Sequence, residues 1–231
     1  MFPSRIFLVG LSGGGKSTIG RLVARRLGWE FADSDEEIER TAKRPVAEIF
    51  EQEGEAAFRE REAEVLRTLA TREPIVVATG GGAPTTAGSR LALGSGFVVW
   101  LAVSPAEAAR RLGADPSTPG RPLLAGDARM KLEALFQARH ELYRGADAAI
   151  DVDELEPDQV ADEVVALWEE WRRDPLPPGS ASMGRSGRPH ARPPGTSRAR
   201  QPSSRLPRPA TRSSSPRAWL RPSARYAATS A

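Results

Sequence analysis

A glycine-rich turn near the start of the chain has the residue types and the spacing of a phosphate-binding loop. The pattern GxxxxGK[ST] occupies residues 10–17, between an apolar, β-branched run and a segment with helical periodicity, and it ends in Lys16 and Ser17. Glycine opens backbone conformations in which successive N–H groups point at one anion, and the N-terminus of the following helix adds the positive end of its dipole. We therefore expect Lys16 to contact the β- and γ-phosphates of a nucleotide and Ser17 to bind Mg²⁺.

Two carboxylates, Asp33 and Asp35, come directly after a second apolar run. Phosphoryl transfer to an alcohol needs a carboxylate that orients or deprotonates the acceptor hydroxyl, and an oxygen ligand for the metal. One aspartate can serve the metal and the nucleotide while the other serves the acceptor. The same pattern is also typical of a helix N-cap, and both interpretations stay open at this point.

Two further segments contain groups that suit an anionic ligand. Arg59 lies in the charged helical phrase FREREAE, where it either binds a carboxylate, steadied by Glu62 at i+3, or is a solvent-exposed arginine. Three glycines, residues 80–82, end the third apolar run. They indicate either a close approach of the backbone to a ligand or a tight turn.

The segment 114–126 is long, polar and rich in proline and glycine, which is typical of a mobile loop or of a lid that closes over a reaction. As part of a lid, Arg121 would bring positive charge to the phosphates. Farther on, Arg139, His140 and Tyr143 lie late in a helical segment, where cations suit the helix dipole. We assign no catalytic role to His140.

The elements that must position these residues follow from the hydrophobic pattern. Strand-like runs alternate with helical segments, an order that predicts a parallel sheet covered by helices on both faces. Such sheets bind ligands at the carboxyl ends of their strands, where the glycine-bearing and aspartate-bearing turns would meet. The strands are predicted at residues 5–9, 29–32, 75–79, 97–101 and 148–152, and the helices at 17–27, 36–41, 46–52, 55–71, 105–112, 127–144 and 157–173.

Composition divides the 231 residues into a domain at 1–174 and a tail at 175–231. The tail holds 11 Arg, 11 Pro and 11 Ser but no Lys, Asp or Glu, so it carries a charge of +11. Residues 1–174, with 22 basic and 30 acidic side chains, carry −8. The tail has too few large apolar residues to offset chain entropy, and we expect it to be disordered. It is either a dispensable extension or a source of weak, salt-dependent binding to nucleic acid.

Two absences limit the possible classes of protein. The chain contains no cysteine, which excludes disulfides, thiolate nucleophiles and cysteine-ligated zinc. No apolar run reaches the roughly 18 residues that suggest a membrane span, and the first strand begins almost at once. We expect a cytoplasmic protein, and a monomer.

Taken together, the separate phrases resemble one family. In order and spacing, GLSGGGKSTIGRLVARRLG, DSDEEIE, FREREAEVL, TGGGAPT, RPLL and RHELYRGADA are similar to the shikimate kinases, relatives of the nucleoside monophosphate kinases, over residues 6–171. The resemblance implies a three-layer α/β P-loop kinase fold with a five-stranded parallel sheet and a lid around residues 111–126. It also implies Mg²⁺-dependent transfer of the ATP γ-phosphoryl group to the 3-hydroxyl of shikimate, on the route to chorismate and aromatic amino acids.

The resemblance further implies residue roles. Catalysis falls on Lys16, Asp33 and Arg121, with Arg111 as a weaker candidate for the arginine of the lid. ATP binding falls on Gly13, Gly14, Gly15, Lys16, Ser17, Thr18 and Arg121, and metal binding on Ser17 and Asp33. Shikimate binding falls on Asp35, Arg59, Gly81 and Arg139, the two arginines holding its carboxylate. After the last strand some members place an arginine near the adenine, whereas residues 151–159 of this chain contain none.

Two alternatives to this function remain. A gluconate kinase-like enzyme, or another small-molecule kinase on the same scaffold, would share the phosphate loop but not explain both Arg59 and Arg139. A nucleotide-binding switch that hydrolyses ATP without an acceptor would leave the two arginines unexplained.

Overall fold

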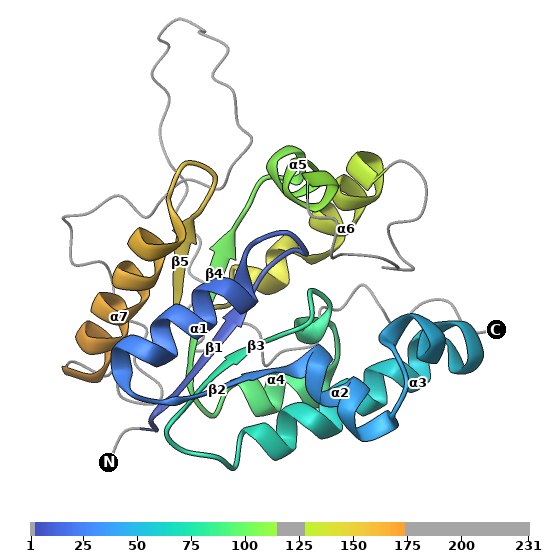
Figure 1. The fold of residues 1–231 in the computed structure, drawn as a ribbon, viewed down its shortest axis with the longest axis horizontal. Coiled ribbons are helices and arrows are strands. Elements are labelled where there is room, and N and C mark those ends of the chain that lie inside the picture. Colours follow the sequence, from blue (N-terminus) through green and yellow to red (C-terminus); the bar gives the residue numbers. More distant parts are fainter. Residues whose placement is uncertain (1–2, 115–127, 174–231) are drawn as a thin grey trace, which may run out of the picture.

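A parallel five-stranded sheet forms the centre of the domain, in the strand order β2-β3-β1-β4-β5 (Figure 1). The computed structural model describes residues 3–114 and 128–173. The strands are β1 (Arg5–Val9), β2 (Glu30–Asp33), β3 (Ile75–Ala78), β4 (Phe97–Ala102) and β5 (Ala148–Asp151). All five predicted strands are confirmed, each to within one residue at either end.

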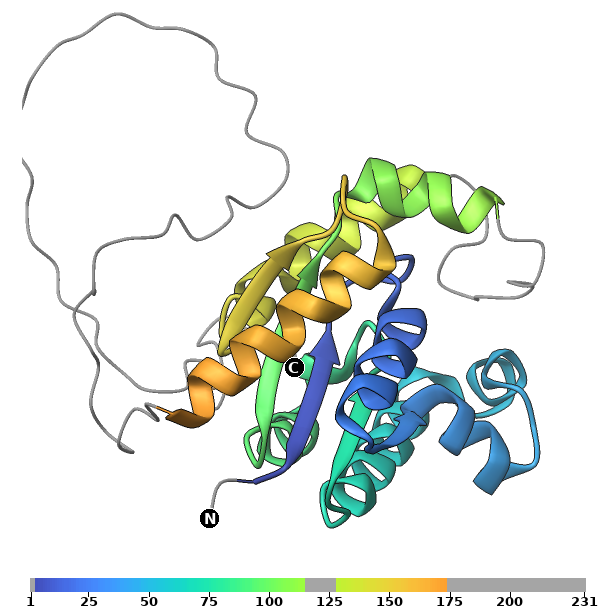
Figure 2. The ribbon, with the colours of Figure 1, turned by 60° about the vertical axis from the view of Figure 1, so that its left-hand side comes forward.

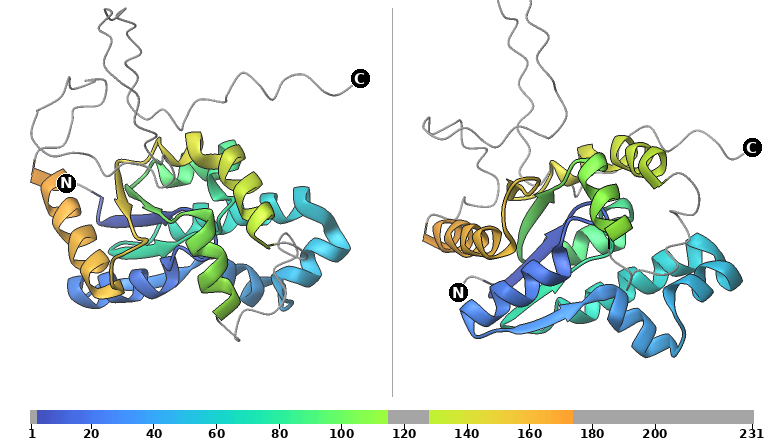
Figure 3. Two further views of the ribbon diagram at one scale, coloured as in Figure 1. Left: turned by 90° about the horizontal axis from the view of Figure 1, so that it is seen from above. Right: turned by 45° about the horizontal axis from the view of Figure 1, so that its top comes forward.

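Helices cover both faces of the sheet, which confirms the three-layer architecture. One face carries α1 (Lys16–Leu27) and α7 (Pro157–Arg173), side by side, and the other carries α3 (Val46–Leu69), α4 (Ala87–Leu93) and α6 (Ala128–Tyr143) (Figures 2 and 3). Two more helices, α2 (Ser34–Ala42) and α5 (Pro105–Ala114), and the 3₁₀ turn η1 (Ala83–Thr85) complete the fold. The sequence prediction missed α4 and η1, because this short segment is rich in glycine and threonine and shows little helical periodicity.

Burial follows the position of each strand in the sheet. Every residue of β3 and β4, and all of β1 after its first residue, is buried. The edge strands β2 and β5 each contain a single buried residue, and their other residues are partly or fully exposed. Near-continuous apolar runs are typical of parallel strands that are covered on both faces. The apolar side of α7 is also part of the core, where Trp168 packs edge-on against Trp29 with ring centroids 4.7 Å apart.

Helix α3 bends at Gly54, which has φ 80° and ψ 174°. The break predicted between residues 52 and 55 is therefore confirmed as a kink. The first half of α3 packs with α2 around a small separate cluster of Ile38, Ile49 and Phe58. The second half of α3 runs back along the sheet beside α4 (Figure 1). Arg59 lies near the start of this half.

Two predictions about element limits are corrected or left open. Helix α2 begins at Ser34, two residues earlier than predicted, because the Asp33 side chain accepts a hydrogen bond from the Asp35 N–H and caps the helix. The tail at 175–231, and Arg121 with most of the predicted lid, lie outside the described residues. Within the part of the chain that the structure describes, no helix is long and apolar enough to cross a membrane.

Candidate active site

The turns that follow β1, β2 and β3 meet at one end of the sheet and border a cavity of about 1010 Å³. The meeting of these turns was predicted from the parallel topology. Gly14 is absent from the lining, and its N–H donates instead to the Leu11 carbonyl at 3.2 Å. The other predicted site residues that the structure describes all line the cavity: Gly13, Gly15, Lys16, Ser17, Thr18, Asp33, Asp35, Arg59, Gly81 and Arg139.

The phosphate loop has the backbone geometry that its glycines predict. Gly10, Gly13 and Gly15 adopt positive φ angles of 138°, 83° and 77°. A Cβ on Gly10 would also lie 2.5 Å from the Leu101 carbonyl oxygen, so only glycine fits there. Gly15 begins α1 without a side-chain cap, and the first turn of α1 has no acidic residue. The first N–H groups of α1 therefore remain suited to an anion.

Lys16 is buried and lies across the loop to which it belongs. Its ammonium donates hydrogen bonds to the carbonyl oxygens of Gly10 at 3.0 Å and Leu11 at 2.7 Å. These two acceptors stabilise the charge in an otherwise poorly solvated position. The predicted phosphate-binding lysine is thus held at the loop, within the cavity.

Asp33 bonds to two neighbours at once, which confirms the N-cap interpretation of the DSD phrase, while its role toward a metal or an acceptor stays a prediction. Its Oδ1 caps α2, and its Oδ2 accepts a hydrogen bond from the Ser17 hydroxyl at 2.5 Å. Ser17 and Asp33 therefore place two hard oxygen donors side by side, as a Mg²⁺ ion bound through one or two protein oxygens requires. The described residues contain no group of three or more His, Cys, Asp or Glu that could hold a metal ion. A metal held here would depend on phosphate oxygens and water for its remaining ligands.

The glycine turn, residues 80–82, allows three charged side chains to lie against the backbone. A Cβ on Gly80 would lie 2.5 Å from Glu62 Oε1 and 2.8 Å from Asp35 Oδ1. A Cβ on Gly82 would overlap the Arg59 guanidinium. The three glycines thus admit close side chains of the protein itself, and the predicted approach of a ligand to this backbone stays a prediction.

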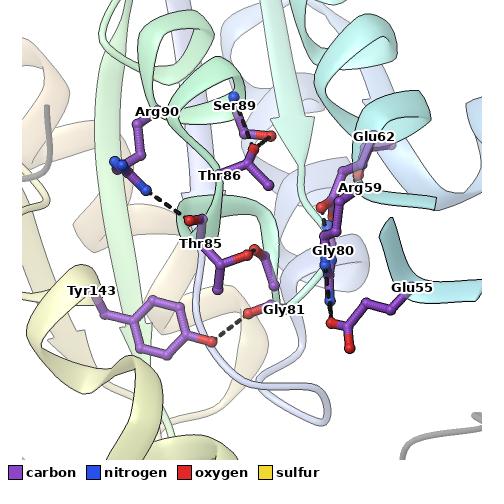
Figure 4. Close-up of polar contacts among 12 residues, drawn as sticks. Glu55, Arg59, Glu62, Gly80, Gly81, Thr85, Thr86, Ser89, Arg90 and Tyr143 are labelled. Carbon is purple, nitrogen blue, oxygen red and sulfur yellow. Dashed lines mark hydrogen bonds and ion pairs between the residues drawn. The ribbon is translucent and has the colours of Figure 1, made fainter. Parts of the chain in front are cut away.

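Arg59 is held between two carboxylates of its own helix (Figure 4). Its Nη1 donates to Glu62 Oε2 at 2.7 Å, which confirms the predicted i+3 support, and its Nη2 donates to Glu55 Oε1 at 3.1 Å. The sequence analysis missed Glu55, although its i−4 spacing was a signal. Burial disfavours the charged form of Arg59, but the charge and hydrogen bond of Glu62 outweigh this effect and raise the pKa of the guanidinium. Arg59 therefore stays charged beside the cavity.

Glu62 is fully buried beneath the glycine turn. Burial raises the pKa of its carboxyl group to about 7, against the opposing charges and hydrogen bond of Arg59 and Arg139, and the neighbouring charge of Asp35 raises it further. Its Oε1 has no hydrogen-bond partner within the described ranges, 3–114 and 128–173. Glu62 therefore exchanges a proton near neutral pH.

Arg139 reaches the same turn from the other side of the site. It lies on α6, 9% exposed, and Tyr143 follows it one helical turn later. The Tyr143 hydroxyl donates to the Gly81 carbonyl at 2.5 Å (Figure 4). Two arginines from distant helices, Arg59 and Arg139, thus flank one glycine turn.

Arg111 lies toward the far end of the cavity, beyond the phosphate loop. Its Nε donates to Glu107 Oε1 at 2.7 Å, and its Nη2 donates to the Val152 carbonyl at 2.5 Å. Hydrogen bonds from Arg110 and then Arg111 lower the pKa of Glu107 to about 2, so this carboxylate is ionised. The cavity continues along the segment that follows β5, as far as Pro157.

Comparisons with known proteins agree with this geometry. A family model described as shikimate kinase matches residues 12–169. A shikimate kinase of Moorella thermoacetica is 44% identical over 170 residues, which cover 73% of this chain and 96% of that protein. A shikimate kinase of Mycobacterium avium is 47% identical over 154 residues, which cover 66% of this chain and 85% of that protein.

Solved structures show the same similarity in three dimensions. The shikimate kinase from Acinetobacter baumannii, in complex with shikimate, is 40% identical with a TM-score of 0.69, and the match covers 74% of this chain and 94% of that chain. The shikimate kinase from Bacteroides thetaiotaomicron is 34% identical with a TM-score of 0.66, and the match covers 71% and 98% respectively.

Proposed function

Because the chain belongs to the shikimate kinase family, it transfers the γ-phosphoryl group of ATP to the 3-hydroxyl of shikimate, and we propose how its residues divide that reaction. The proposal places ATP at the phosphate loop and shikimate at the glycine turn. The single observation that supports it best is that Arg59 and Arg139, from two different helices, flank the glycine turn.

The donor side of the site is the phosphate loop with the first turn of α1. Its N–H groups and Lys16 bind the phosphates, and Lys16 exchanges its two carbonyl partners for phosphate oxygens. Ser17 and Asp33 would hold Mg²⁺ through their side-chain oxygens, and the ion would supply positive charge beside the phosphates. The Gly14 N–H, which is bonded within the loop, takes no part unless the loop rearranges.

The acceptor side is built for a hydroxylated anion. Arg59 and Arg139 bind the shikimate carboxylate, together with the backbone of Gly81. Asp35 accepts hydrogen bonds from shikimate hydroxyls, and Asp33 lies where it can orient the 3-hydroxyl toward the phosphate. Positive groups for the carboxylate and negative groups for the hydroxyls thus line one cavity.

The resemblance alone supports a role for Arg121, and the lining of the cavity supports one for Arg111 and Pro157. We propose that Arg121 brings positive charge to ATP when the lid closes, as its RPLL phrase implies. Arg111 and Pro157 then lie at the nucleotide end of the cavity and are candidates for the adenine contacts.

Substitutions on the donor side and on the acceptor side of the site distinguish the role of Lys16 from that of Arg139. Arg139→Ala is expected to raise the KM for shikimate about 10- to 100-fold while the KM for ATP stays within about twofold, because charge-assisted hydrogen bonds contribute about 1.5–3 kcal/mol. Lys16→Ala is expected to lower kcat by at least about 10²-fold. Arg144→Ala, which changes an exposed arginine of the same segment paired only with Glu141 among the described residues, is the matched control for Arg139. A rise in the KM for ATP with no change for shikimate would contradict the assignment of Arg139.

A panel of hydroxy acids tests the acceptor itself. ADP formation from Mg-ATP is expected with shikimate and to be near background with gluconate or without any acceptor. Turnover of gluconate but not of shikimate would favour the gluconate kinase-like alternative, and acceptor-independent ADP formation would favour the switch.

A further inference from the structure

Tyr143 is the one residue of the RHELYRGADA phrase that is fully buried beside the glycine turn, and the roles proposed above do not use it. Its ring lies against Trp100 of β4, with centroids 5.8 Å apart and planes inclined by 26°. This packing fixes the ring, so the direction of the hydroxyl is fixed as well. The hydroxyl is the only polar group of the side chain, and it points at the Gly81 carbonyl (Figure 4).

The hydroxyl lies between two functional groups from separate parts of the chain. It donates to the Gly81 carbonyl at 2.5 Å, a residue 62 positions away in the sequence. Arg139, one helical turn earlier on α6, lies close enough to the same hydroxyl that its positive charge acts to lower the pKa of Tyr143. Burial raises the pKa of Tyr143 to about 12, so the hydroxyl keeps its proton and remains a donor at neutral pH.

The glycine turn is also fixed on its two other sides. On the β2 side, the Gly80 N–H donates to the Ser34 hydroxyl at 3.0 Å. On the α4 side, Arg90 Nη1 donates to the carbonyls of Pro84 at 2.8 Å and Thr85 at 2.9 Å, in the η1 turn that follows the glycines. Tyr143 supplies a bond from α6 (Figure 4). This bond joins the glycine turn to the helix that carries Arg139.

We propose that Tyr143 is a positioning residue for shikimate, whose hydroxyl holds the Arg139 guanidinium and the Gly81 peptide in one fixed arrangement around the substrate carboxylate. The inference rests on the proposed roles of Arg139 and Gly81. A guanidinium that donates one hydrogen bond to this hydroxyl keeps its other donors for the carboxylate and is limited in its rotation. A guanidinium that is already ordered loses less conformational entropy when the substrate binds.

A double-mutant cycle tests this arrangement. Tyr143→Phe keeps the ring and its contact with Trp100 but removes the hydroxyl. It is expected to raise the KM for shikimate about 10-fold, with kcat and the KM for ATP within about twofold. In the Arg139→Ala background, the same change is expected to raise the KM for shikimate less than about twofold, because the guanidinium that the hydroxyl orients is gone. Equal factors in the two backgrounds would overturn the proposal.

Failure of the inference is distinguishable from failure of the proposed function. If Arg139→Ala alone leaves the KM for shikimate unchanged, the role of Arg139 is wrong. If Arg139→Ala raises that KM but the cycle is additive, only the role of Tyr143 is wrong. Ser95→Ala is the matched control, because it also removes a hydroxyl that donates to a backbone carbonyl, at 2.6 Å, but lies before the first residue of β4, at the opposite end of the sheet.

A measurement that keeps the Tyr143 hydroxyl covers the case in which Tyr143→Phe does not fold. The chain contains two tyrosines, so labelling with 3-fluorotyrosine gives two ¹⁹F resonances, which Tyr226→Phe assigns. Shikimate is expected to shift the Tyr143 resonance, and the shift is expected to disappear in Arg139→Ala even at shikimate concentrations that saturate that variant. An unshifted Tyr143 resonance at saturating shikimate would overturn the proposal.

Discussion

Glu62 combines full burial, an ion pair with Arg59 and a pKa near 7. Folding raises this pKa from its usual value of 4.5, so between these values the folded protein holds a proton that the unfolded chain has lost. The free energy of unfolding therefore falls as the pH rises through this window, by about 3 kcal/mol in total.

Glu62→Gln removes this proton exchange. The free energy of unfolding of the variant minus that of the unsubstituted protein is expected to grow by about 3 kcal/mol between pH 4 and pH 8. Urea denaturation at a series of pH values measures it. A difference that stays constant, or that shrinks as the pH rises, would show that Glu62 is ionised in the folded protein throughout the range.

A substitution at Gly82 is expected to change substrate binding much more than it changes stability. Its φ of −99° suits any residue, but a methyl group there would overlap the Arg59 guanidinium, the mobile end of a long side chain. Gly82→Ala is therefore expected to displace Arg59 and raise the KM for shikimate about tenfold, with a loss of stability below about 1 kcal/mol. Steady-state kinetics and thermal melting measure the two effects. Gly88→Ala, on α4, is the control, and an unchanged KM in Gly82→Ala would contradict the role of Arg59 at the turn.

The kink in α3 is expected to depend on glycine at residue 54, so a substitution there should lower stability. Gly54, at φ 80° and ψ 174°, occupies a region that is essentially restricted to glycine, whereas Gly28, at φ 67° and ψ 33°, occupies the left-handed helical region that other residues also visit. A Cβ at either position meets nothing within 4 Å. Gly54→Ala is expected to cost about 2 kcal/mol and Gly28→Ala about 1 kcal/mol, by urea denaturation. Equal losses would show that the backbone at residue 54 relaxes.

The elements were largely predictable because each gives a local signal. Apolar runs bounded by glycine or proline gave all five strands, and helical periodicity gave the long helices. The segment of η1 and α4 was missed because it depends on packing against elements outside itself, α3 and α6. Strand order was likewise not predicted, since sequence periodicity carries no information about which strands are neighbours.

Those parts of the candidate site were predictable whose residues lie close together in the sequence. The phosphate loop and the Arg59–Glu62 pair are local in sequence, and the structure confirms their geometry. The bond between Tyr143 and Gly81 joins residues 62 positions apart, so no spacing rule reveals it. Asp33 shows a third case, because its carboxylate caps α2, as one interpretation of the sequence predicted, and its second oxygen stays available for the other role through its bond with Ser17.

For the whole molecule, the charge division predicts that the tail and the kinase domain are independent. The family match ends at residue 169, before the Arg-, Pro- and Ser-rich residues 175–231 begin. Removal of residues 175–231 is expected to leave kcat and both KM values within about twofold, while the net charge changes from +3 to −8. Steady-state kinetics on the full and shortened chains measure this. A large loss of turnover would show that the tail contributes to the reaction.

The two carbonyl bonds of Lys16 have a consequence for the order of events when nucleotide arrives. In the free protein the ammonium already has acceptors at Gly10 and Leu11, so its charge does not depend on a bound anion for compensation. Nucleotide binding at this residue is then an exchange of one set of oxygen atoms for another. The loop therefore orders Lys16 without a bound ligand, and a phosphate must replace the two main-chain carbonyls as the hydrogen-bond acceptor of the Lys16 ammonium.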